Sequence, residues 1–372
     1  MPELDTIRGI AILLVVFFHG FGFTFSTTGL SRLPRLFVQA TLPGWMGVNL
    51  FFVLSGFLIT GILLDAREKP HFYKNFYIRR ALRILPAYYL LLLVLLIVPR
   101  IGFVDNRQIS WGFVGLSIVY LSNMVQFFGV PMQYGPLWSL AVEEHFYLLW
   151  PTAVRILSRR VLTYVAIAIF FCCPLLRAIA YELRYEYGSG YTWLASDGLA
   201  AGAILALYCR RADVTRKSAL QFSLICMAAA FLLLAVGMPF GILLSGRLLG
   251  GGSLRVTMLT LFFTGTLAAT LLVGTSRWKW LVRRPVLQFF GEISYGLYLI
   301  HMLIYDMFDH FASRYFPGIS AESAQGHFGY ILARFTLATG LAVAIAFISR
   351  RTFEAKFLSL KDRWTSGTSS NA

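Results

Sequence analysis

Residues Leu90 to Val98 read Leu-Leu-Leu-Leu-Val-Leu-Leu-Ile-Val, without a single polar side chain. A second stretch, Met258 to Val273, is interrupted only by threonines and one glycine. A helix that crosses the hydrocarbon core of a bilayer needs roughly 20 mostly apolar residues, and many segments of this chain reach or approach that length. The chain is therefore predicted to cross a membrane several times.

Composition supports this prediction. Of 372 residues, 58% are hydrophobic and only 13% are charged, whereas soluble domains carry about 25% charged residues. The formal net charge is +16. On a soluble protein such a charge would suggest nucleic acid as a partner, but no zinc-finger spacing or basic aromatic module accompanies it. In a membrane protein the surplus is typical of cytoplasmic loops, and we expect no nucleic-acid partner.

Hydropathy predicts ten spans, with ends uncertain by about three residues. They are 7–25, 44–64, 76–99, 137–154, 162–181, 192–209, 219–238, 256–274, 289–309 and 328–349. A further apolar stretch, 111–125, is short, and its pattern fits either a span or a re-entrant piece.

Loop charge decides between these two readings. The basic segments are 65–83, 155–160, 210–217, 277–284 and the tail after residue 349. All of them fall on one side only if 111–125 does not cross. The predicted fold is thus an all-α, polytopic transmembrane helix bundle of about ten spans, with a partly inserted 111–125 segment and both termini cytoplasmic.

The rest of the chain leaves no room for a soluble domain. We expect residues 1–360 to form the transmembrane domain and 361–372 to be a short, polar, disordered tail. The first apolar stretch is too long for a signal peptide and contains charge, so it is predicted to be a retained helix.

All four cysteines lie in or next to apolar segments, which favours small buried side chains over disulfides or metal ligands. They are Cys172, Cys173, Cys209 and Cys226.

Arg8 and His19 belong to the first predicted span, where ionisable residues are costly and are functional candidates. Eleven residues separate them, so they point the same way, roughly 16 Å apart along a helix. Arg8 alone could be a snorkelling anchor, and His19 could be a packing histidine. Arg80 and Arg83 share one face of another span at its cytoplasmic end, where positive charge is also common.

Acidic and aromatic polar residues appear deeper. Glu143 and Glu144 are adjacent and point about 100° apart on a helix, so one could face a cavity while the other pairs with a neighbouring helix. Asp197 lies in the outer half of its span, where a cap or an interhelical hydrogen bond would also explain it. Ser294, Tyr298 and His301 follow the spacing of one helix face. The candidate residues on the acceptor side are Asp197, Tyr298 and His301.

These residues form a directional pattern. Arginines gather at the predicted cytoplasmic mouth, and guanidinium groups suit phosphate because they bind it with two hydrogen bonds. Histidine and carboxylates gather deeper, and they suit proton transfer near neutral pH. The pattern indicates a phosphorylated donor that enters from the cytoplasm and a reaction deeper in the membrane. No metal site is expected.

At these residues the sequence resembles the acyltransferase 3 family of membrane O-acyltransferases, over nearly the whole chain. The matching blocks are Leu4 to Gly9 followed by His19, Gly47 to Ile59, Phe76 to Pro86, Trp138 to Tyr147 and Ser294 to His301. Two positions depart from the pattern: Asn49 stands where the family often has Asp, and His145 where it often has Gln. We therefore assign no essential charge to Asn49 and no catalytic role to His145.

The resemblance implies a bacterial enzyme of the cytoplasmic membrane. It would move an acyl group, commonly acetyl, from the co-substrate acyl-CoA (acetyl-CoA) to a hydroxyl of a surface carbohydrate or lipid-linked glycan. His19 would be catalytic, as general base or as acyl carrier, and Glu143 or Glu144 would orient the histidine or the acceptor. Arg8, Arg80 and Arg83 would bind the donor. Some members carry a fused esterase-like domain, which we do not expect in this chain.

Two other classes of protein fit part of the pattern. A proton-coupled transporter of a small anionic or sugar-like solute would also place acids and histidines inside spans, although such folds often show matching inverted halves, which this sequence does not. A membrane sensor or scaffold would tolerate replacement of His19. The sequence contains no Gly-x-Ser-x-Gly elbow, P-loop or zinc-protease motif.

Overall fold

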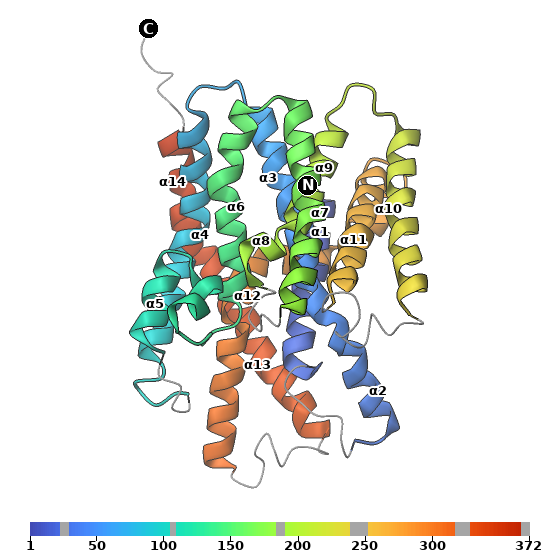
Figure 1. The fold of residues 1–372 in the computed structure, drawn as a ribbon. Coiled ribbons are helices and arrows are strands. Elements are labelled where there is room, and N and C mark those ends of the chain that lie inside the picture. The colour runs from blue at the N-terminus through green and yellow to red at the C-terminus, as the bar shows by residue number, and fades with distance from the viewer. Residues whose placement is uncertain (23–29, 105–108, 184–189, 239–251, 317–327, 366–372) are drawn as a thin grey trace.

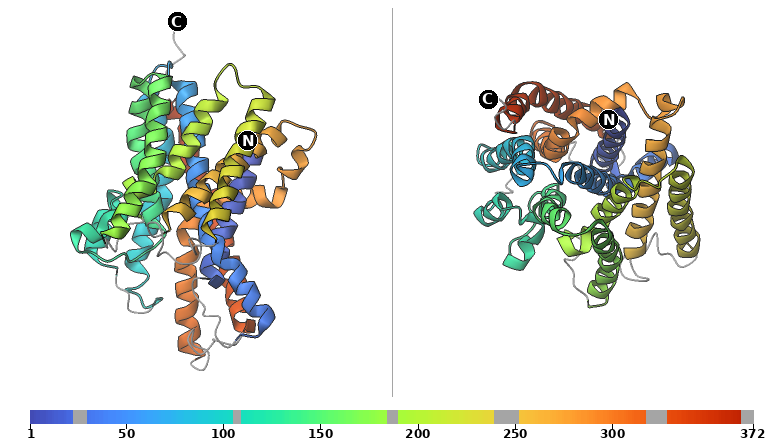
Figure 2. Two further views of the ribbon diagram at one scale, coloured as in Figure 1. Left: turned by 45° about the vertical axis from the view of Figure 1, so that its right-hand side comes forward. Right: turned by 90° about the horizontal axis from the view of Figure 1, so that it is seen from above.

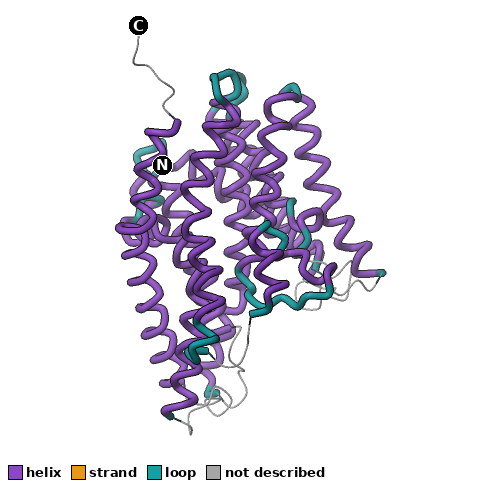
Figure 3. Tube along the Cα trace, turned by 90° about the vertical axis from the view of Figure 1, so that its left-hand side faces the viewer, coloured by secondary structure: helices purple, strands orange, loops and turns teal. Residues whose placement is uncertain are grey.

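The computed structural model describes residues 1–22, 30–104, 109–183, 190–238, 252–316 and 328–365 (Figure 1). Over these residues the secondary structure is entirely helical, without strands. Figure 3 shows the helices running side by side, joined by loops at the two ends of the bundle. The predicted all-α class is confirmed.

Eight helical segments in the described part of the chain are long and apolar enough to cross a membrane. They are α1 (Pro2–Phe17) with the π-helix η1 (Phe18–Gly22); α2 (Arg32–Thr41), η2 (Leu42–Trp45) and α3 (Met46–Ala66) as one run; α4 (Phe72–Ile97); α7 (Arg159–Glu182); α10 (Arg216–Gly237); α11 (Ser253–Gly274); α12 (Pro285–Tyr315); and α13 (Phe328–Ser349) running on into η6 (Arg350–Glu354) and α14 (Ala355–Thr365).

Two more helices occupy predicted spans. Helix α6 (Leu137–Ile156) carries three polar residues at its centre, from Glu143 to His145, which lower its hydropathy. Helix α9 (Asp197–Cys209) is short and apolar, and it follows the single turn of α8 (Thr192–Ala195). Each of the ten predicted spans therefore coincides with a helix, while eight segments meet the length and composition of a membrane span.

The segment 111–125 does not form one continuous helix. Helix α5 (Trp111–Ile118) rises about 12 Å, which is too short to cross a bilayer. Its end lies beside α4, because the Tyr89 hydroxyl donates to the carbonyl of Ile118. Tyr120 then takes a left-handed backbone conformation, with φ of 59°, before the 3-10 helix η3 (Ser122–Phe128) begins. The segment thus turns at Tyr120, as a re-entrant piece would.

Three loops that lie within the predicted basic segments are found at one end of the bundle (Figure 1). The loops 67–71, 157–158 and 210–215, which join α3 to α4, α6 to α7 and α9 to α10, lie together at the end marked by the C-terminus (Figure 1). At the opposite end, α2 and the distal parts of α12 and α13 extend beyond the other helices (Figure 2). Basic loops on one side are what the loop-charge argument predicts.

Helices α1 and α12 cross in direct backbone contact. A Cβ atom on Gly9 would lie 1.9 Å from the carbonyl oxygen of Leu287, and one on Gly291 would lie 1.9 Å from that of Asp5. Glycine is therefore required at both positions, as in close helix crossings of membrane proteins generally. This crossing places the polar face of α12, which includes Ser294 and His301, next to α1.

The C-terminal helix extends past the predicted domain boundary at residue 360. Helix α14 packs against α4 and ends at Thr365. Residues 366–372 of the predicted disordered tail lie outside the described residues. The remaining outer pair, α10 and α11, lies at one edge of the bundle, away from α4 and α14 (Figure 2).

Candidate functional site

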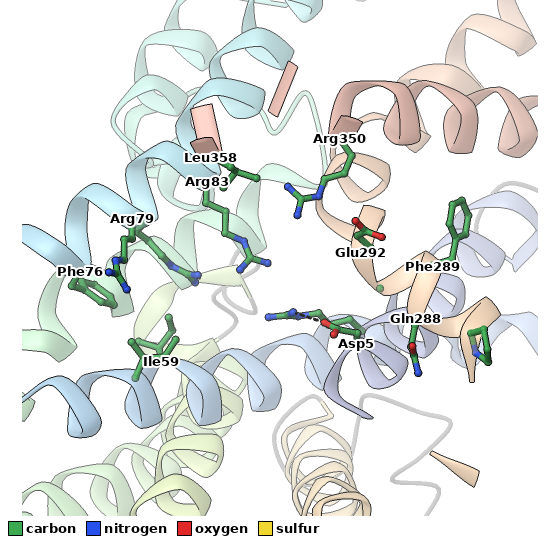
Figure 4. Close-up of a pocket in the computed structure, with 15 residues that line it drawn as sticks. Asp5, Ile59, Phe76, Arg79, Arg83, Gln288, Phe289, Glu292, Arg350 and Leu358 are labelled. Carbon is green, nitrogen blue, oxygen red and sulfur yellow. Dashed lines mark hydrogen bonds and ion pairs between the residues drawn. The ribbon is translucent and has the colours of Figure 1, made fainter. Parts of the chain in front are cut away.

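A cavity of about 940 Å³ opens between α1, α3, α4, α12 and the C-terminal segment η6–α14 (Figure 4). Five arginines and two carboxylates line it. The arginines are Arg8, Arg79, Arg80, Arg83 and Arg350, and the acids are Asp5 and Glu292. The structure thus brings together the three arginines that the sequence predicted as donor ligands. We call this space the arginine cavity.

Local structure explains why the arginines converge. Arg80 and Arg83 are one turn apart on α4 and share a face. Arg8 projects from α1 with its guanidinium 3.0 Å from the Asp5 carboxylate. Arg83 is in electrostatic contact with both Arg8 and Arg80. It is exposed, although helices surround it, because the cavity reaches it.

A second cavity, of about 100 Å³, adjoins the first and penetrates deeper between α3, α4, α6 and α12. Both cavities are lined by the predicted donor arginines. The second also contains the acidic pair of α6 and a polar face of α12. The shared residues are Arg8, Arg80 and Arg83, and the additional polar ones are Ser55, Ser139, Glu143, Glu144, Tyr147, Ser294, Tyr295 and Tyr298. We call it the inner cavity.

Glu143 and Glu144 both line the inner cavity. The Ser55 hydroxyl of α3 donates to Glu143 Oε1 at 2.9 Å, and the Tyr147 hydroxyl donates to Oε2 at 3.0 Å. Glu143 therefore faces the cavity and also pairs with a neighbouring helix. Glu144 additionally lines a side cavity of about 270 Å³. Arg80, whose guanidinium lies 3.8 Å above the Tyr147 ring, is in electrostatic contact with both carboxylates.

Beyond the inner cavity, polar groups continue towards α1. The hydroxyls of Ser139 and Tyr298 are 2.5 Å apart, and the Tyr298 ring lies 5.8 Å from the His301 ring, centroid to centroid. His301 Nε2 is 3.2 Å from His19 Nδ1. The structure thus pairs His19 with His301, while His19 is absent from the linings of the arginine cavity and the inner cavity.

When both imidazoles are neutral, their hydrogen-bond partners assign the tautomers. His301 Nδ1 lies 2.8 Å from the backbone carbonyl of Tyr298, which can only accept, so Nδ1 carries the proton. His301 Nε2 must then accept from His19 Nδ1, which also lies 3.0 Å from the carbonyl of Val15. The basic nitrogen of His19 is therefore Nε2.

His19 belongs to the π-helix η1 rather than to a regular α-helix. Arg334 of α13 donates to the carbonyl of Gly20 at 3.3 Å, and it forms two short hydrogen bonds, 2.5 and 2.6 Å, with Asp309. π-Turns within helices are frequent at functional sites. The ion pair therefore supports the backbone turn that presents His19.

Asp197 lies elsewhere. Both of its carboxylate oxygens accept hydrogen bonds from Arg177 of α7, at 2.7 and 3.1 Å, and Arg177 also donates to the carbonyl of Leu194. Asp197 lines neither the arginine cavity nor the inner cavity.

His145, to which the sequence assigned no catalytic role, pairs with the hydroxyl of Thr192 at 2.6 Å. The described residues contain no cluster of His, Cys, Asp or Glu that could hold a metal.

Sequence reasoning missed several residues of the site. Tyr147 follows Glu143 by one helical turn, and that spacing could have identified it. Ser55 reaches Glu143 from another helix, which no local pattern reveals. Arg350 was counted only as a basic residue of the C-terminal tail, yet it lines the arginine cavity.

Comparison with known proteins gives a consistent family. A family model described as an acyltransferase domain, Acyl_transf_3, matches residues 1–351. The chain is 27% identical, over 81% of its length, to peptidoglycan O-acetyltransferase OatA of Listeria monocytogenes, of which it covers 49%. It is 30% identical, over 81% of its length, to the putative peptidoglycan O-acetyltransferase YrhL of Bacillus subtilis, of which it covers 48%. The chain thus spans about half the length of these curated relatives, and no solved structure matches it significantly.

Proposed function

The chain belongs to the acyltransferase 3 family, and on that basis we propose that it is a membrane O-acyltransferase that moves an acyl group, acetyl, from acyl-CoA to a hydroxyl of a surface carbohydrate or lipid-linked glycan. The arginine end would face the cytoplasm of a bacterial cell, with the chain in the cytoplasmic membrane. The printed names of the relatives, O-acetyltransferases of peptidoglycan among them, support an acetyl group and a glycan acceptor.

The observation that carries this proposal is the arginine cavity and its connection to the acidic inner cavity. Five arginines against two carboxylates attract a polyanion, and guanidinium groups bind phosphate with paired hydrogen bonds. Arg8, Arg80 and Arg83 form the boundary between the two cavities. A donor whose phosphates stay among these arginines can therefore extend a thin arm past Glu143 and Glu144.

The arm would point towards His19. Arg8 and His19 are roughly 16 Å apart along α1, a span that suits the pantetheine arm of a coenzyme. Ser139 and Tyr298 close the deep end of the inner cavity, and His301 follows one turn further along α12. In this proposal Tyr298 lies beside the reacting groups, and His301 holds His19 in the tautomer whose Nε2 is basic. Asp197 has no part in it, because Arg177 holds its carboxylate.

The reaction follows from that tautomer. The acceptor hydroxyl attacks the thioester carbonyl while His19 Nε2 removes its proton. A C–O bond forms, the C–S bond breaks, and the leaving thiolate takes up the proton. In the alternative route, Nε2 attacks the carbonyl and the C–S bond breaks with loss of the thiolate. The acceptor oxygen then takes the acyl group as the N–C bond breaks, and its proton passes to the thiolate. Both routes use the same nitrogen, and Glu143 or Glu144 would orient the histidine or the acceptor.

Replacement of His19 tests the proposal. We expect His19→Gln to reduce transfer of labelled acetyl from acetyl-CoA by roughly 10²- to 10⁴-fold, which is the usual contribution of a general base. The measurement is acetyl incorporation into extracted glycan by membranes that contain equal amounts of protein. His310→Gln, on the same helix as His301 but outside the cavities, is the matched control. Transfer by His19→Gln at the wild-type rate would exclude this role.

A further inference from the structure

The C-terminal segment η6–α14, which packs against α4, contributes residues to the wall of the arginine cavity. Figure 4 shows Arg350 on this segment and Arg83 on α4, with both side chains reaching into the space between them. Leu358 of α14 also lines the cavity, although α14 lies beyond the residues matched by the family model.

Arg350 is presented by a π-helix. It is the first residue of η6, where the helical turn widens after α13. Glu354, buried at the other end of this turn, lies 3.9 Å from the Arg350 guanidinium. This separation is at the outer limit of an ion pair, so Glu354 offsets part of the charge of Arg350 without a close hydrogen bond. The guanidinium of Arg350 also lies within electrostatic range of that of Arg83.

Like charges near one another raise the free energy of the empty cavity. Arg83 lies within electrostatic range of Arg8, Arg80 and Arg350, and Glu354 offsets part of the charge of both Arg83 and Arg350. Among the described residues, no carboxylate lies within hydrogen-bond distance of either guanidinium. Both groups can therefore donate hydrogen bonds to a phosphate that enters between them.

We propose that Arg350 is a further ligand-binding residue, and that a phosphate group of the donor nucleotide is bound between Arg350 and Arg83. This inference rests on the proposed function, because it assigns the same cavity to the donor. It goes further in naming a phosphate-binding residue from the C-terminal segment.

The adjacent residue supplies a matched control. Arg351 carries the same charge, but it is exposed, lies over the Phe347 ring at 5.4 Å and does not line the cavity. Arg350→Ala and Arg351→Ala therefore remove the same charge one position apart. Arg350→Lys keeps the charge but removes the paired geometry. Thermal unfolding of each variant of the full chain shows whether the fold is kept.

The test is binding of defined probes to the purified full chain in nanodiscs. The probes are coenzyme A, its form without the ribose phosphate, pantetheine 4′-phosphate, which has one phosphate, and inorganic pyrophosphate. We expect Arg350→Ala to weaken coenzyme A binding about tenfold or more, as the loss of a charge-assisted hydrogen-bonded contact does. The affinity of Arg350→Lys for coenzyme A should lie between those of Arg350→Ala and the wild type. Arg351→Ala should change this affinity less than twofold.

Three results would overturn the inference. Wild-type affinity in Arg350→Ala, or equal weakening by Arg350→Ala and Arg351→Ala, would remove Arg350 from the site. Pyrophosphate binding that Arg350→Ala leaves unchanged would show that Arg350 binds no phosphate. Failure of the proposed function gives another result: pyrophosphate and coenzyme A would bind with the expected dependence on Arg350, but acetyl-CoA would support no transfer.

Discussion

Two groups of arginines lie inside this helix bundle, and they differ in whether a carboxylate pairs with them. Arg177 and Arg334 each meet a carboxylate through two hydrogen bonds, and their side chains are 9% and 2% exposed. Arg80 and Arg83 have no carboxylate within ion-pair distance among the described residues, and both line an open cavity. Paired arginines join helices, whereas the arginines without a hydrogen-bonded carboxylate line the cavity that we propose for an anionic ligand.

Solvation explains the difference. A buried guanidinium must be matched within the protein, because the loss of one partner leaves an uncompensated charge in a medium of low dielectric constant. A guanidinium that lines a water-filled cavity keeps part of its hydration until a ligand replaces the water. The comparison therefore predicts that changes in the first group alter stability, and that changes in the second alter binding.

The largest effect on stability is expected from Asp197→Asn. It leaves Arg177 buried without a counter-charge, which should lower the free energy of unfolding by about 3–5 kcal/mol. Thermal unfolding in detergent measures the loss. Replacement of both partners, Arg177→Met with Asp197→Leu, should restore most of it. If Asp197→Asn were as stable as the wild type but inactive in transfer, the carboxylate would belong to the acceptor site instead.

Arg80→Ala combined with Arg83→Ala is expected to weaken donor binding and to leave stability nearly unchanged. Both side chains lose contact with the donor phosphates, so the apparent KM for acetyl-CoA should rise roughly 10- to 100-fold. The unfolding temperature should change little, because neither arginine has a carboxylate within ion-pair distance among the described residues. Steady-state transfer at varied donor concentration measures the first quantity. An unchanged donor KM would contradict phosphate binding at these residues.

The smallest effect is expected from Asp65→Asn. Its carboxylate forms two hydrogen bonds with Arg210, at 2.6 and 2.8 Å, but its side chain is 63% exposed. Exposed ion pairs contribute about 0–1 kcal/mol, so the unfolding temperature and the transfer rate should both stay near the wild-type values. A loss of stability as large as that of Asp197→Asn would show that exposure does not determine how much an ion pair stabilises this protein.

Much of the fold was predictable because hydropathy indicates which segments form membrane helices and charge indicates on which side the loops lie. The ten predicted spans coincide with helices, and 111–125 proved to be two short pieces turning at Tyr120. The boundaries of α12 were not predictable. It runs from Pro285 to Tyr315 rather than over 289–309, because its distal part extends beyond the other helices and includes polar residues.

The candidate site was predictable where it depends on one helix. The spacing of Arg80 and Arg83 placed both at one face, and the structure puts Arg8 beside them. The contact between His19 and His301 depends on how α1 and α12 cross at Gly9 and Gly291. The partner of Asp197 likewise depends on packing between two helices. Such contacts follow from helix packing and leave no periodic signal in a single sequence.

The length of α12 bears on how a group could cross the bilayer. His301 lies about 24 Å along the helix from Pro285, which is most of the roughly 30 Å thickness of a hydrocarbon core. A coenzyme bearing several phosphates would face a large Born penalty on that path. A neutral acetyl thioester faces almost none. Under the proposed function, the phosphates would stay among the arginines at one end and the histidine pair would lie near the other. The coenzyme itself would then not have to cross the bilayer, because only its small, uncharged acyl group would travel.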